Sequence, residues 1–165
     1  MLKRLWLPFV CLLVIGCAKK TPPGTWPAHV TDYKNFSEEQ KAELTEALDY
    51  LNQKSSRTVI DLNSNGAGFP ISFELVDPDA TAPMRGGLTF LTEEGCTIQL
   101  SRKVYETAYA SERIPVVIHE IGHCGGLVHN PTTREIMYKT ASPLKDYAPD
   151  AFDRFFASLF SQAAL

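Results

Sequence analysis

The sequence has little positive charge. Its 165 residues include 16 Lys and Arg against 19 Asp and Glu, a formal net charge of −3 at pH 7. Proteins that bind nucleic acid need a basic patch, so we expect no nucleic-acid partner. Compositional extremes are also absent: 44% hydrophobic and 21% charged residues are ordinary values, which exclude a fibrous or largely disordered chain.

Long hydrophobic runs are lacking too. The apolar run Leu5–Ile15 has about eleven residues, whereas a membrane-spanning helix needs about 20. Lys3 and Arg4 precede the run, which is the pattern of a signal peptide. We therefore predict that residues 1–16 are a signal peptide and not a membrane span.

The end of this segment resembles the lipobox of bacterial lipoproteins, because small residues precede a cysteine in Val14-Ile15-Gly16-Cys17. The resemblance implies that Cys17 is acylated and becomes the new N-terminus, with the rest of the chain outside the cytoplasm and anchored to a lipid membrane. Ala18, where an Asp would favour the inner membrane, implies the outer membrane if the host is Gram-negative. The alternative is an ordinary signal peptide with an incidental cysteine.

Cysteine is scarce, with four in the chain. Cys11 leaves with the signal peptide and Cys17 is the lipidation site, so Cys96 and Cys124 remain as a possible disulfide pair. Two separate buried thiols, or a metal-bound Cys96 thiolate, are the alternatives.

Residues 17–36 are rich in chain breakers, including Pro22, Pro23, Gly24 and Pro27, and we interpret them as the lipidated N-terminus and an extended tether. The remaining residues, 37–165, form one predicted domain. We expect this domain to be a monomer.

The domain begins with a predicted helix from Ser37 to about Lys54. Ser37 and Gln40 form a capping box, and apolar residues recur on one helical face at Leu44, Ala47, Leu48 and Leu51. Short runs of β type follow at Thr58–Leu62, Ile71–Val76, Leu88–Leu91 and Thr97–Ser101. Either a hairpin or a crossover can join the last two.

Two further helices are predicted in the second half. Apolar residues from Pro115 onward indicate a buried helix that ends at Gly125-Gly126, and Asp150 to about Gln162 is a final amphipathic helix. A scaffold helix, a small sheet, a motif helix and a closing helix predict a single α+β domain. Between the first two strands, Asp61, Asn63, Asn65 and Gly66 favour an ordinary turn over a calcium loop.

The chemistry is concentrated in the segment His119–His129. His119 and His123 lie four residues apart, so a helix presents both imidazoles on one face, where they can bind one zinc ion. Gly126 permits a sharp turn that can return His129 as a third ligand. Such a site leaves a position open for water, and Glu120 is placed to take a proton from that water.

These eleven residues resemble the extended zinc signature of the metzincin metallopeptidases, in which two helix histidines, a glycine turn and a third histidine follow in that order. The resemblance covers residues 114–138. It implies a metzincin-like domain with a small mixed twisted sheet, a scaffold helix, an active-site helix and a C-terminal helix. It also implies one catalytic Zn²⁺ and hydrolysis of peptide bonds.

Met137 stands eight residues after His129, and in metzincins a methionine turn supports the histidines. The short gap is most similar to the matrixin branch. Some other branches use a tyrosine two residues after the methionine as a further ligand, but Lys139 stands there, so Tyr138 is assigned to the pocket wall.

The sequence thus predicts a zinc-dependent endopeptidase that acts on proteins or peptides at the cell envelope. Gly87, Leu88, Thr89 and Tyr138 are the predicted substrate-binding residues, because an edge strand can hold an extended peptide through its main chain. Two other hypotheses fit the same residues: a non-catalytic zinc-holding binding or inhibitory lipoprotein, and a hydrolase of cell-wall peptides. A metal-buffering lipoprotein would need more ligands.

Overall fold

The computed structural model describes residues 26–63, 68–77 and 86–162. The predicted signal peptide, Cys17 and three residues of the predicted turn at 61–66, Ser64, Asn65 and Gly66, lie outside these ranges. Four strands and five helical segments follow in the order β1 (Ala28–Lys34), α1 (Glu38–Lys54), β2 (Phe69–Val76), β3 (Gly87–Leu91), β4 (Cys96–Ser101), α2 (Arg102–Thr107), α3 (Ala110–Cys124), the 3₁₀ turn η1 (Leu144–Asp146) and α4 (Ala151–Gln162).

The strands form one mixed sheet in the order β1-β2-β4-β3. Strands β1, β2 and β4 are parallel, whereas β3 runs antiparallel to β4 at one edge of the sheet. The connection between β3 and β4 is therefore a hairpin, which is closed by the Thr92 N–H donating to the Gly95 carbonyl at 2.9 Å.

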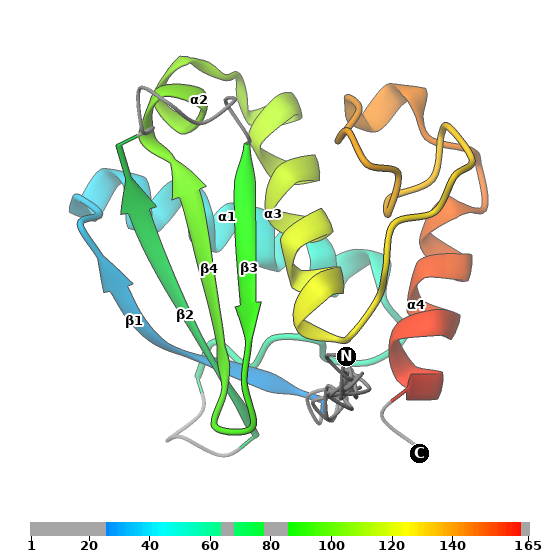
Figure 1. The fold of residues 1–165 in the computed structure, drawn as a ribbon, viewed down its shortest axis with the longest axis horizontal. Helices are drawn as coiled ribbons and strands as arrows, with labels where there is room; N and C mark the ends of the chain where they lie inside the picture. The colour runs from blue at the N-terminus through cyan, green and yellow to red at the C-terminus, as the bar shows by residue number, and fades with distance from the viewer. Residues whose placement is uncertain (1–25, 64–67, 78–85, 163–165) are drawn as a thin grey trace, which may run out of the picture.

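Helices α1 and α3 pack on one face of the sheet, and Figure 1 shows α1 crossing behind the strands and α3 beside β3. The face toward the helices supplies the apolar core, in which Ile71, Phe73, Leu75, Ile98 and Leu100 are almost completely buried. The opposite face is polar, as in the ladder from Gln99 through Glu74 to Lys34. This alternation follows from the two-residue period of strands.

Two of the three predicted helices match closely. Helix α1 begins after Ser37, whose side chain and that of Gln40 complete the predicted capping box. Helix α4 begins one residue later than predicted, and α3 begins at Ala110, five residues before Pro115. No helix in the described ranges is both long and apolar enough to span a membrane.

Thr58–Leu62 is not a strand, so that prediction was wrong. Ile60 forms only an isolated bridge with Ala28. The side chain of Asn52, near the end of α1, bonds both main-chain groups of Ile60 and the N–H of Val59, which are groups that a strand would use for its ladder.

The sheet also begins inside the segment assigned to the tether, because β1 starts at Ala28 and pairs with β2. Residues of β1 are mostly half-buried or exposed, as expected at a sheet edge, so they lack the apolar alternation of a half-buried strand. The short helix α2 was not predicted either.

Candidate metal centre and active site

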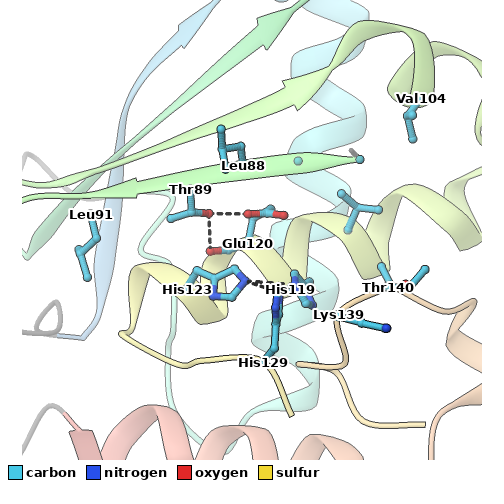
Figure 2. A pocket seen from close by; sticks show the side chains of 14 residues that line it. Leu88, Thr89, Leu91, Val104, His119, Glu120, His123, His129, Lys139 and Thr140 are labelled. Atoms are coloured by element: carbon cyan, nitrogen blue, oxygen red, sulfur yellow. Dashed lines mark hydrogen bonds between the residues drawn. The ribbon is translucent and has the colours of Figure 1, made fainter. Parts of the chain in front are cut away.

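Helix α3 presents its two histidines as the spacing predicts. The Nε2 atoms of His119 and His123 lie 3.2 Å apart, with the side chain of His119 buried and that of His123 half-buried. Both rings project from the C-terminal part of α3 toward His129, which lies in the loop that follows the helix (Figure 2).

The turn after α3 returns the third histidine. Gly126 adopts a φ of +79°, the Leu127 N–H donates to the Gly122 carbonyl at 3.0 Å, and the Gly126 N–H donates to the His123 carbonyl at 2.9 Å. This is the Schellman arrangement of hydrogen bonds, in which a left-handed residue ends the helix. A side chain other than glycine would be strained there, which explains the glycine in the motif.

The three Nε2 atoms form a nearly equilateral triangle. The distance from His129 to His119 is 3.3 Å and from His129 to His123 is 3.2 Å. Three nitrogens bound tetrahedrally at about 2.0–2.1 Å from one zinc ion would lie about 3.3–3.4 Å apart. The donor set therefore fits one Zn²⁺ ion.

Two main-chain carbonyls determine the tautomers of His119 and His123. His119 Nδ1 lies 2.8 Å from the Ile136 carbonyl oxygen, and His123 Nδ1 lies 2.7 Å from that of Leu127. Because a carbonyl only accepts, each Nδ1 carries the proton and donates it, which leaves the Nε2 lone pair toward the centre of the triangle. Lone pairs that converge in this way repel one another unless a cation lies between them.

Burial lowers the pKa of His119 to about 4, although the hydrogen bond to Ile136 acts in the opposite direction. The imidazole is therefore neutral near pH 7, and a neutral imidazole is the form that binds a metal.

The segment around Met137 is hydrogen-bonded to the parts of the chain that carry the histidines. The Asn130 N–H, next to His129, donates to the Met137 carbonyl at 2.7 Å, and Ile136 supplies the carbonyl for His119. The Met137 side chain is buried against α3 at Gly122, where a Cβ would lie 2.3 Å from its sulfur. Met137 therefore packs directly against the helix that carries His119 and His123.

Glu120 lies between α3 and β3 and is almost completely buried. Thr89 of β3 donates its hydroxyl to Glu120 Oε2 at 2.6 Å (Figure 2). Burial raises the pKa of Glu120, while the Thr89 hydrogen bond and the charge of His123 act to lower it. A buried carboxyl group with a raised pKa holds a proton more readily than an exposed one, which suits a group that exchanges protons.

The histidines and Glu120 line a cleft of about 780 Å³. The predicted substrate-binding residues Gly87, Leu88 and Thr89 line one wall, and Ala141 also lines the cleft. Lys139 and Thr140 lie across the cleft from Leu88 and Thr89 (Figure 2). Tyr138 is half-buried and is not among the lining residues. His129 is exposed, so the centre can be reached from solvent.

Cys96 and Cys124 form a disulfide, with their Cα atoms 5.6 Å apart. The bond joins the first residue of β4 to the last residue of α3, directly after His123. Both cysteines are buried, and Cys96 is therefore not a metal ligand.

Some groups of the site were not assigned their roles from sequence. The sequence predicted that Thr89 binds substrate through its main chain and gave its hydroxyl no role. The contacts made by the carbonyls of Ile136 and Leu127 were not predicted. The alternation of β3, which turns Gly87 and Thr89 to the same face, could have indicated that Thr89 points inward. Every residue has a main-chain carbonyl, so the sequence does not indicate which carbonyl will contact a histidine.

Comparison with solved structures found two similar chains. Archaemetzincin from Methanopyrus kandleri has a similar fold, with a TM-score of 0.51 and 10% sequence identity over 81% of this chain and 94% of its own. A zinc-dependent peptidase from Methanocorpusculum labreanum matches with a TM-score of 0.40 and 16% identity, over 80% of this chain and 99% of its own. No protein-family model and no curated protein matches the sequence.

At 10% identity the archaemetzincin likeness concerns the fold alone. The chain is an α+β domain with a mixed sheet, as the sequence predicted; the sheet has four strands, and the fold is similar to that of archaemetzincin.

Proposed function

We propose that this chain is a zinc-dependent endopeptidase of the metzincin type, closest to the matrixin branch. The observation that carries the proposal is the triangle of three Nε2 atoms, 3.2–3.3 Å apart, beside the buried carboxyl of Glu120 in an open cleft. A purely structural metal site normally closes its coordination with a fourth protein ligand. Within the described ranges, no fourth His, Cys, Asp or Glu joins this cluster.

When bound, Zn²⁺ would be held by His119, His123 and His129 and would supply a Lewis acid that polarises a carbonyl and acidifies water. Glu120 is the general base of this proposal. Its carboxylate takes a proton from the attacking water and returns it to the leaving amine, so that one residue serves both steps.

The substrate would lie along β3. This strand pairs with β4 on one side, and no strand in the described part of the chain pairs with its other side. Main-chain groups from Gly87 to Leu91 can bind an extended peptide there, with affinity that depends little on the peptide's side chains. Such binding suits an enzyme that cleaves within a chain.

The substitution Glu120→Gln tests the function. It removes the base and keeps the shape, so we expect hydrolysis of casein or a quenched peptide library to fall by at least about 100-fold with zinc content unchanged. Glu112→Gln, an exposed carboxylate in the first turn of the same helix, is the matched control and should keep full activity. A chelator should stop the wild-type protein, and added Zn²⁺ should restore it.

The alternatives give different results in the same assays. A binding or inhibitory lipoprotein would hold one zinc ion and cleave nothing. A cell-wall peptide hydrolase would release fragments from muropeptides and leave casein intact. Full activity in Glu120→Gln would refute the mechanism itself.

We also propose that the protein works as a monomer at the cell envelope, anchored by an acylated Cys17 with its domain outside the cytoplasm. The lipobox-like sequence supports this location, and so does the disulfide, because disulfides persist mainly outside reducing compartments.

A further inference from the structure

Strand β3 lies close to α3 at Glu120. Gly87 and Thr89 are two residues apart on β3, so they face the same side of the sheet, and both line the cleft beside Glu120. A Cβ at Gly87 would lie 2.7 Å from Glu120 Cγ and 2.8 Å from Oε1, so the missing side chain makes room for the carboxyl group. The strand therefore surrounds Glu120 closely on one side.

At the next position facing the same way, Thr89 places a hydroxyl against Glu120. Its Oγ1 lies 2.6 Å from Oε2 and 3.2 Å from the main-chain oxygen of Glu120, and both contacts are drawn in Figure 2. One hydroxyl has one proton, and the shorter contact to the charged acceptor is the stronger. The hydroxyl thus donates to the carboxylate, and the main-chain contact keeps the threonine close to the helix.

We propose that Thr89 is a positioning residue for Glu120, holding Oε2 so that Oε1 is the oxygen that exchanges the proton in the cleft. This inference rests on the proposed function. It assigns the Thr89 side chain a role separate from any substrate binding by the main chain of β3.

The need for such a residue follows from the shape of glutamate. Its side chain has three rotatable bonds, and a general base works only within hydrogen-bonding reach of the proton that it takes. No other hydrogen bond to the Glu120 carboxylate is found in the described residues, and the Thr89 hydroxyl therefore determines which way the carboxyl group faces. A displacement of about 1 Å at a reacting group can cost about 100-fold in rate.

The test compares Thr89→Val, which keeps the shape and removes the hydroxyl, with Thr89→Ser, which keeps the hydroxyl. We expect Thr89→Val to lower kcat by about 10-fold to 100-fold with KM nearly unchanged, and Thr89→Ser to recover most of kcat. Zinc content and thermal stability, measured on each variant, show whether the fold and the metal site are intact.

Thr97→Val is the matched control. Thr97 lies on the neighbouring strand β4, and its hydroxyl is 3.0 Å from that of Ser72, away from the cleft. The same chemical change at Thr97 should leave kcat and KM as in the wild type.

Infrared spectra give a readout that does not depend on catalysis. In zinc-free protein with ¹³C-labelled glutamate carboxyls, loss of the hydroxyl should shift one carboxylate band in Thr89→Val and not in Thr89→Ser. Wild-type kcat in a Thr89→Val protein, or a spectrum identical to the wild type, would overturn the proposal for Thr89 and leave the proposed function standing. A wild-type protein that cleaves no peptide would instead refute the proposed function, and the positioning role of Thr89 in catalysis with it.

Discussion

Gly122 permits the contact between the active-site helix and the segment beneath the metal centre. A Cβ at this position would lie 2.3 Å from the Met137 sulfur and 2.9 Å from Cε2 of Phe155. Helix propensity alone would favour alanine over glycine inside a helix, by about 1 kcal/mol. For the substitution Gly122→Ala, packing against Met137 therefore predicts a loss of unfolding free energy, and helix propensity predicts a gain.

We expect the packing effect to be the larger, so that Gly122→Ala destabilises the protein. The added methyl group must displace Met137 and Phe155, and overpacking of this kind costs about 1–3 kcal/mol of unfolding free energy. Urea unfolding of the zinc-free protein measures the change. In the double variant Gly122→Ala with Met137→Ala the clash with sulfur is gone, so the alanine should cost less there than in the wild-type background; a gain in stability from the single variant would contradict the packing argument.

At the residue scale, the sequence predicts those groups whose positions a local geometry determines. His119 and His123 share a helix face, and Gly126 is where the helix must end, so short spacing is enough to bring His129 back. Thr89 meets Glu120 across 31 residues of sequence, and nothing local to either residue indicates that contact. Long-range pairs of this kind need the sheet to be known first.

At the scale of elements, the helix ends that were predicted well are those that carry signals in the sequence. The capping box at Ser37 and the glycines after Cys124 mark boundaries directly. The segment Thr58–Leu62 has strand-like composition, yet the Asn52 side chain takes its hydrogen bonds. The pattern of apolar residues in a sequence does not show where a side chain takes the place of a partner strand.

The disulfide is the covalent link between elements, since it joins β4 to the end of α3. Its cysteines are 28 residues apart, and closing a loop of that length in the unfolded chain stabilises the fold by roughly 3–4 kcal/mol in the chain-entropy account. We predict that the paired substitution Cys96→Ala and Cys124→Ala lowers the free energy of unfolding by about that amount.

Chemical denaturation with and without a reductant checks this prediction. A reductant strong enough to open the buried bond should lower the stability of the wild-type protein toward that of the paired variant and leave the variant unchanged. Equal stability of the two oxidised proteins would mean that the bond adds nothing to the fold.

At the scale of the whole molecule, the fold class could be predicted and the topology could not. One scaffold helix, a few strands and two later helices already indicate an α+β domain. The order β1-β2-β4-β3 depends on parallel pairings between distant segments, and β1 lacks the apolar alternation that would have identified it.

The lipid anchor is also a property of the whole chain. We predict that Cys17→Ser abolishes incorporation of labelled palmitate and moves the protein from the membrane fraction to the soluble extracellular or periplasmic fraction. Cys11→Ser, within the proposed signal peptide, is the matched control and should leave both unchanged. Palmitate labelling that survives Cys17→Ser would contradict the lipobox interpretation.

The metal centre is assembled from a short piece of chain. All three ligand nitrogens and the carbonyls that orient two of them come from residues 119–136. The entropic cost of bringing chain segments together grows with the length of the loop between them, so this convergence requires little ordering elsewhere in the chain. We therefore expect the three ligands to approach one another at little entropic cost, whether or not the distant parallel strands have paired.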